Sequence, residues 1–174
     1  TVTSPLTGIK SFQSPVITAN GISRGTIEFI NSDLIPLNNL SFTDSWAQAN
    51  TQIALVPAFD NTCGGNFTYN AAVSRRSFSF AGGQVPPQVG GVSGRCRVSF
   101  DVVMDGSGSS PFTNTLLANT VTTAEGFSNP ANISGPLARI THSLTILKSF
   151  NPLALLSVGD PSILTVTIGN PAAS

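Results

Sequence analysis

The chain has 174 residues, of which 40% are hydrophobic and only 9% are charged, and its formal net charge is +0. This balance excludes the basic surface of a nucleic-acid-binding protein. No apolar run approaches the roughly 20 residues that span a bilayer as a helix, so we expect no membrane span in these residues. Ser, Thr and Asn must then supply most of the solvated surface.

Short runs with alternating hydrophobic side chains, separated by glycine and proline, recur along the chain. Residues 25–31 and 76–83 alternate in this way, and residues 95–106 do so over the longest stretch. The last run places five side chains on one face: Cys96, Val98, Phe100, Val102 and Met104. Period two is the pattern of half-buried strands. The best helical candidate, residues 44–52, supports at most one turn, so the sequence predicts an all-β antiparallel sandwich.

Two cysteines are present, Cys63 and Cys96. They lack the CxxC spacing and the nearby histidine of a metal site. A single disulfide is therefore favoured over two buried thiols, which indicates an oxidising compartment.

The chain repeats its opening near its end. Residues 6–31 align with residues 144–170, so that Lys10 corresponds to Lys148 and Thr26 to Thr165. We therefore expect a complete sandwich in residues 6–143 and the first strands of a second, incomplete repeat in residues 144–174. The residues expected at the repeat junction and in assembly are Lys148, Phe150, Pro152, Gly159 and Asn170.

The connection between the repeats, residues 136–150, contains no glycine and no proline after Pro136. This predicts a short, stiff junction. The partial repeat has two explanations: it belongs to a longer tandem array, or it completes a sandwich on a neighbouring chain by strand addition. In either case the expected partners are copies of the chain or adjacent repeats.

Several motifs follow one another in an order that resembles a known bacterial family. They are K-x-F-x-P with L-T-x-T-x-x-N near the end, F-T-D from Phe42, T-C-G-G from Thr62, F-T-N-T-L from Phe112 and T-T-x-x-G-x-x-N-P from Thr122. Together they are similar to the surface-repeat domains named domain of unknown function eleven. One departure is residues 46–48, which replace the family's L-P-A-G turn.

The resemblance implies an immunoglobulin-like sandwich in a large secreted or surface-anchored bacterial protein. It also implies a disulfide between Cys63 and Cys96. A ligand is not implied, because a fold is not a function.

The sequence gives little support for a catalytic or a metal-binding function. The single histidine, His142, lies in the connection and far in sequence from any acidic residue. Asp101 and Asp105 could ligate calcium weakly, but two carboxylates are too few and the following glycines favour a turn. We expect a non-catalytic protein without metal or cofactor.

One group of residues suggests a covalent modification. Lys10, one of two lysines, lies among apolar residues on the first expected strand. In immunoglobulin-like surface domains, such a lysine can form an amide with a late-strand asparagine, helped by a buried carboxylate. The corresponding residues are Lys10, Asn114 and Asp44. The alternative is an exposed lysine, with Asn114 bonding backbone in a turn.

The low charge, the tandem period and the expected disulfide favour an extracellular structural repeat that forms a cell-surface stalk, fibre or filament. The alternative is an adhesin module that recognises a sugar or a host protein. Exposed aromatic side chains would favour the adhesin, and the candidates for them are Trp46 and Tyr69.

Overall fold

The computed structural model describes residues 4–48, 50–106, 110–140, 145–151, 157 and 159–169. The described residues form strands and no helix, so none of them forms a helix long and apolar enough to cross a membrane. The strands are β1 (Leu6–Phe12), β2 (Val16–Thr18), β3 (Ile22–Asn31), β4 (Leu37–Ser45), β5 (Thr51–Ile53), β6 (Asp60–Asn61), β7 (Asn66–Thr68), β8 (Ser77–Val85), β9 (Gly94–Met104), β10 (Phe112–Leu116), β11 (Ile133–Ile140), β12 (Thr145–Asn151) and β13 (Ile163–Gly169).

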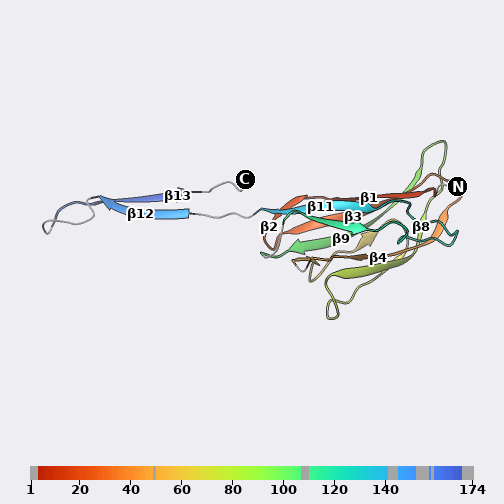
Figure 1. The fold of residues 1–174 in the computed structure, drawn as a ribbon, viewed down its shortest axis with the longest axis horizontal. Coiled ribbons are helices and arrows are strands. Elements are labelled where there is room, and N and C mark those ends of the chain that lie inside the picture. The colour runs from red at the N-terminus through yellow and green to blue at the C-terminus, as the bar shows by residue number, and fades with distance from the viewer. Residues whose placement is uncertain are drawn as a thin grey trace. The chain divides into compact units, whose positions relative to one another are not determined.

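The chain divides into two compact units, Thr1–Arg139 and Ile140–Ser174. In the first unit, one sheet has the strand order β1-β3-β9-β5, with β6 also paired to β9. Two smaller sheets have the orders β10-β11-β2 and β4-β8-β7. The pairings between these strands are antiparallel, and β4 and β8 form a layer opposite β1, β3, β9 and β11 (Figure 1). The predicted all-β antiparallel sandwich is confirmed.

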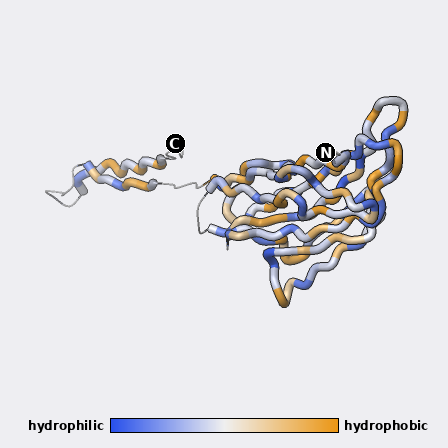
Figure 2. Tube along the Cα trace, turned by 45° about the vertical axis from the view of Figure 1, so that its right-hand side comes forward, coloured by the Kyte–Doolittle hydropathy of each residue, from blue (hydrophilic) through white to orange (hydrophobic). Residues whose placement is uncertain are grey.

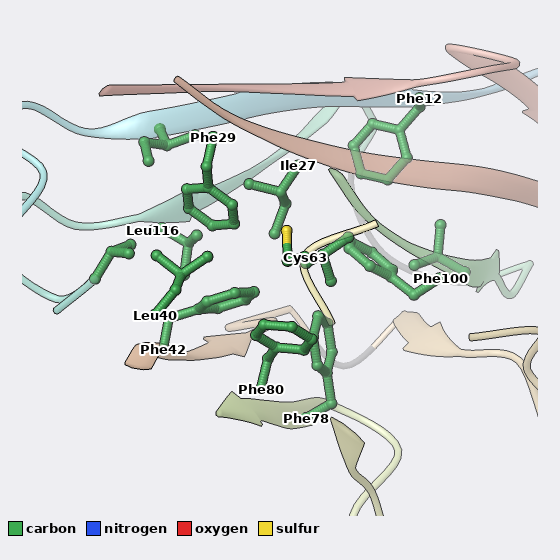
Figure 3. Close-up of a cluster of buried hydrophobic side chains, with 14 of the residues drawn as sticks. Phe12, Ile27, Phe29, Leu40, Phe42, Cys63, Phe78, Phe80, Phe100 and Leu116 are labelled. Carbon is green, nitrogen blue, oxygen red and sulfur yellow. The ribbon is translucent and has the colours of Figure 1, made fainter. Parts of the chain in front are cut away.

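The hydrophobic core lies between these layers because the strands alternate as the sequence predicts. The five side chains assigned to one face of β9 are all buried. Phenylalanines from the two layers, such as Phe29 on β3 and Phe80 on β8, point toward one another (Figure 3). Hydrophobic and hydrophilic residues alternate along these strands in Figure 2. Each strand therefore contributes one apolar face to a common core.

The segment with the best helical signal, residues 44–52, contains no helix in its described residues, 44–48 and 50–52. Strand β4 continues through Ser45, and β5 begins at Thr51. Trp46 is only 1% exposed, and its ring packs against Phe78 and Phe100. Burial of this large ring decides the local structure. Trp46 is therefore not one of the exposed aromatic side chains that would favour an adhesin, and Tyr69 is partly buried against the same core.

The two cysteines form the expected disulfide. Cys63, in the segment between β6 and β7, is bonded to Cys96 on β9, with a distance of 5.0 Å between their Cα atoms. Both residues are buried. The bond therefore fixes the β6 to β7 segment onto the large sheet.

The second unit contains an antiparallel hairpin of β12 and β13. Of the expected junction residues, Lys148 and Phe150 lie on β12, and Gly159 lies in the connection with a φ of 97°. Pro152, Asn170 and His142 lie outside the described residues, as do residues 141–144. The stiff junction therefore stays a prediction.

Gly25 on β3 tests how closely the core is packed. A Cβ atom at this position would lie 2.6 Å from Phe100 Cε2 and 3.1 Å from Phe12 Cε1. Because the Phe100 ring is fully buried, we expect Gly25→Ala to lower the free energy of unfolding by about 1–3 kcal/mol. Urea denaturation measures this change. Gly106→Ala, where a Cβ meets no atom within 4 Å, is the control, and equal effects of the two substitutions would contradict the packing.

The disulfide should stabilise the fold through the unfolded chain. Its cysteines are 33 residues apart, and closing a loop of this length contributes about 3–4 kcal/mol in the chain-entropy model. We expect the Cys63→Ala/Cys96→Ala variant to unfold at lower urea than the oxidised protein. Addition of a reductant should destabilise the wild type and leave the variant unchanged. A wild type insensitive to reductant would count against the bond.

Candidate functional site

Three buried polar side chains, one from each sheet of the first unit, lie together beside the aromatic core. Lys10 is on β1, Asp44 on β4 and Asn114 on β10. They are 4%, 0% and 1% exposed. The structure therefore brings together the three residues that the sequence analysis grouped, and Lys10 is buried rather than exposed.

The alternation of the strands places these polar groups inside the core. Lys10 occupies the inward position between Leu6 and Phe12 on β1, and Asp44 follows Leu40 and Phe42 on the inward face of β4. The Lys10 Nζ lies 2.6 Å from Asp44 Oδ2. It also lies 5.8 Å from the centre of the Trp46 ring and 5.8 Å from that of Phe100. The pair is thus enclosed by aromatic carbon rather than by water.

Burial drives both members of this pair toward their neutral forms. Desolvation lowers the pKa of Lys10, and the attraction of Asp44 opposes this change only in part. Desolvation likewise raises the pKa of Asp44 against the opposing effects of Lys10 and Asn114. Low dielectric disfavours the charged form of each group. The proton shared by the pair is therefore shifted from the amine toward the carboxyl group.

The carboxamide of Asn114 lies beside the same carboxyl group. Its Nδ2 donates a hydrogen bond to the Ser45 backbone oxygen at 2.9 Å, and the side chain lies within hydrogen-bonding reach of Asp44. Asp44 Oδ1 and Asn114 Oδ1 are both buried without a hydrogen-bond partner. Two unsatisfied buried acceptors are costly. A proton on Asp44 Oδ1 would turn that atom from an unpaired acceptor into a donor.

Gly135 on β11 is a part of the site that the sequence analysis missed. It pairs directly with Asn114 across the β10 and β11 ladder. A Cβ on Gly135 would lie 3.1 Å from Lys10 Cγ and 3.0 Å from the Lys10 backbone oxygen. The missing side chain therefore lets Lys10 pass close to the strand pair that carries Asn114. A glycine inside a strand run was the available signal, since it marks a close approach.

The weak calcium site is not assembled. Asp101 Oδ1 lies 3.1 Å from Arg24 Nη1, and its Oδ2 accepts a hydrogen bond from the Ala58 backbone amide. Within the described residues, no three His, Cys, Asp or Glu side chains gather closely enough to hold a metal ion. Asp101 thus serves an ion pair and a loop contact.

Comparison with known families places the chain in one of them. The model of the domain of unknown function DUF7933 matches residues 7–134, so the chain belongs to that family. The match includes Lys10, Asp44 and Asn114. The likeness to domain of unknown function eleven stays a prediction. No curated protein matches the sequence.

Solved structures share the fold at low sequence identity. The D312A form of BcpA, the major pilin subunit of Bacillus cereus, is 11% identical with a TM-score of 0.53 over 96% of this chain, which spans 56% of the pilin. A collagen-binding domain from a Staphylococcus aureus adhesin is 10% identical, with a TM-score of 0.47 over 79% of this chain and 99% of that domain. The similarity to the pilin supports an immunoglobulin-like sandwich. At 11% identity it shows the fold and not the function of this chain.

The buried pair predicts an asymmetry between single and double substitution. Asp44→Ala leaves the Lys10 amine buried without its acceptor, whereas Lys10→Met with Asp44→Leu replaces both polar groups by apolar ones of similar size. We expect the single variant to be less stable than the double variant by about 1–3 kcal/mol. Urea denaturation of the two variants measures the difference. Equal stability, or a less stable double variant, would mean that the amine is not buried as described.

Proposed function

We propose that this chain is a non-catalytic structural repeat of a bacterial cell-surface stalk, fibre or filament. The observation that carries the proposal is the strand pairing of the second unit, which repeats that of β1 with β3. The disulfide supports an extracellular location, because disulfides persist in oxidising compartments.

The pairing of β12 with β13 has the same register as the pairing of β1 with β3. Lys148 faces Val166 as Lys10 faces Ile27. Ser149 faces Thr165, which is the same pair of residue types as Ser11 with Thr26. Strand register decides which face every side chain occupies. The β1 and β3 pair and the β12 and β13 pair therefore present corresponding faces. The aligned residues thus share structure as well as sequence.

One face of the second hairpin needs a covering layer. The positions on the side of Lys148 are apolar and exposed in this chain: Ile146, Phe150, Leu164, Val166 and Ile168. In the first unit the corresponding Phe12, Ile27 and Phe29 are buried. The opposite face of the hairpin is mixed, with Thr and Ser at four of its eight positions and with Leu147 and Ile163 also exposed. An exposed apolar sheet face of this kind favours a partner.

The layer that covers this apolar face could come from a further repeat or from the first unit of an identical copy. The packing around Gly25 favours the further repeat. Leu164, which pairs with Phe150, holds the position that Gly25 holds opposite Phe12. In the first unit even a single Cβ at this position would lie 2.6 Å from Phe100. A leucine there would collide with the buried ring, so strand exchange between identical copies is disfavoured. The proposal is therefore a tandem array whose next sandwich covers β12 and β13.

Electron microscopy and side-chain footprinting of the protein from its native source test this role together. We expect negative-stain images of rods with a regular spacing along their axis. In hydroxyl-radical footprinting, Phe150 should be as protected as Phe12 in the native rods, and it should be labelled in the isolated 174-residue chain. Leu147, on the opposite hairpin face, is the internal control and should be labelled in both samples.

Compact particles without a repeating axis, together with free labelling of Phe150 in the native protein, would overturn the array. A rod that ends in a distinct head would assign adhesion to other parts of the protein. Trp46 is the main aromatic candidate for an adhesin surface on this chain. Because it is buried in the core, it gives the adhesin alternative no support.

A further inference from the structure

We propose that Lys10 and Asn114 become joined by an intramolecular amide bond between Lys10 Nζ and Asn114 Cγ, with Asp44 carrying the protons. The inference concerns chemistry inside the first unit. It is independent of the array proposed above, because all its residues lie in one sandwich.

The nucleophile is prepared by its surroundings. Lys10 is held by Asp44 Oδ2 at 2.6 Å and is flanked by the rings of Trp46 and Phe100. Only the unprotonated amine has a free electron pair, and a lysine in an apolar, desolvated site is the more reactive for this reason. The same enclosure excludes water, which would compete for the electrophile. Lys148, exposed on β12, lies 5.5 Å from the centre of the Phe150 ring but is not desolvated in this way.

The electrophile and the acid lie in the same enclosure. Asn114 is fixed in the middle of β10 by its ladder pairing to Gly135 and by its hydrogen bond to Ser45. Gly135 leaves room for the Lys10 stem on the strand next to Asn114. Holding two reactants in one geometry raises their effective concentration by many orders of magnitude. An amide carbon that is inert toward free amines thereby becomes a competent target.

The proposed reaction balances without an oxidant or any co-reactant. The neutral Lys10 amine attacks Asn114 Cγ while the protonated Asp44 carboxyl donates its proton to Asn114 Oδ1. Asp44 then accepts a proton from the attacking nitrogen and passes one to Nδ2. The bond from Cγ to Nδ2 breaks and ammonia leaves, and Oδ1 returns its proton to Asp44, which restores the carbonyl and the neutral carboxyl group. One carboxamide and one amine have become one secondary amide and one ammonia.

The unsatisfied oxygens of the site support this assignment. Asp44 Oδ1 and Asn114 Oδ1 lack partners in the noncovalent arrangement. The carboxyl proton that the reaction requires would turn Asp44 Oδ1 from an unpaired acceptor into a donor.

Intact-mass spectrometry of the denatured, reduced 174-residue chain tests the bond. We expect the wild type to be lighter than its sequence by about 17 Da, the mass of one ammonia. The Lys10→Arg, Asn114→Ala and Asp44→Ala variants should each have the mass of their own sequence. Lys148→Arg, which changes the other lysine, should keep the loss and is the matched control.

Tryptic mapping of the wild type locates the bond even if a variant fails to fold. Trypsin should not cleave after Lys10, and a branched peptide should join residues 1–24 to residues 98–139 through Lys10 and Asn114. Cleavage after Lys10, when wild-type protein purified in its folded state is denatured and then digested, would overturn the proposal. So would an ammonia loss that persists in a folded Lys10→Arg variant, because that loss would come from another asparagine.

Discussion

The contact between Lys10 and Asp44 is the constraint on which the rest of the first unit depends. A lysine placed inward on a core strand requires a buried partner, and Asp44 supplies it from the opposite layer. Trp46 and Phe100 close the apolar wall around the pair, which explains why Trp46 is a core residue rather than a surface one. Gly135 leaves room for the same lysine, since a Cβ there would lie 3.1 Å from Lys10 Cγ. The polar cluster and the aromatic core are therefore one arrangement.

The positions of Lys10 and Asn114 in the fold bear on how the domain would resist a pulling force. Lys10 lies on the first strand of the sandwich, and Asn114 lies on β10, next to the last strand, β11. An amide between them would carry tension from one side of the domain to the other without passing through residues 11–113. The Cys63 to Cys96 disulfide lies within that segment. The proposed amide bond and the proposed array would meet the same requirement, which is a unit that does not lengthen when its ends are pulled.

Much of this organisation could be predicted from the sequence, because it follows from local periodicity. The alternation of residues 95–106 predicts β9 and its buried face correctly, and the spacing of two isolated cysteines favours the disulfide. Trp46 could not be placed, since burial of one large ring depends on Phe78 and Phe100 from distant strands. The role of Gly135 depends on a contact with residue 10 across more than a hundred residues. The sequence also could not choose between a tandem array and strand exchange, because that choice depends on packing between strands far apart in the chain.

The measurement that tests the account most directly is single-molecule force extension of the full chain, pulled from its two ends under reducing conditions. If Lys10 and Asn114 are joined, residues 11–113 stay out of the extended path. The contour length gained on unfolding should then fall short of that of the Asn114→Ala variant by roughly 350 Å, at about 3.3–3.6 Å per extended residue. Equal contour lengths for the wild type and the variant would show that the domain bears load through hydrogen bonds and packing alone, and would contradict the account.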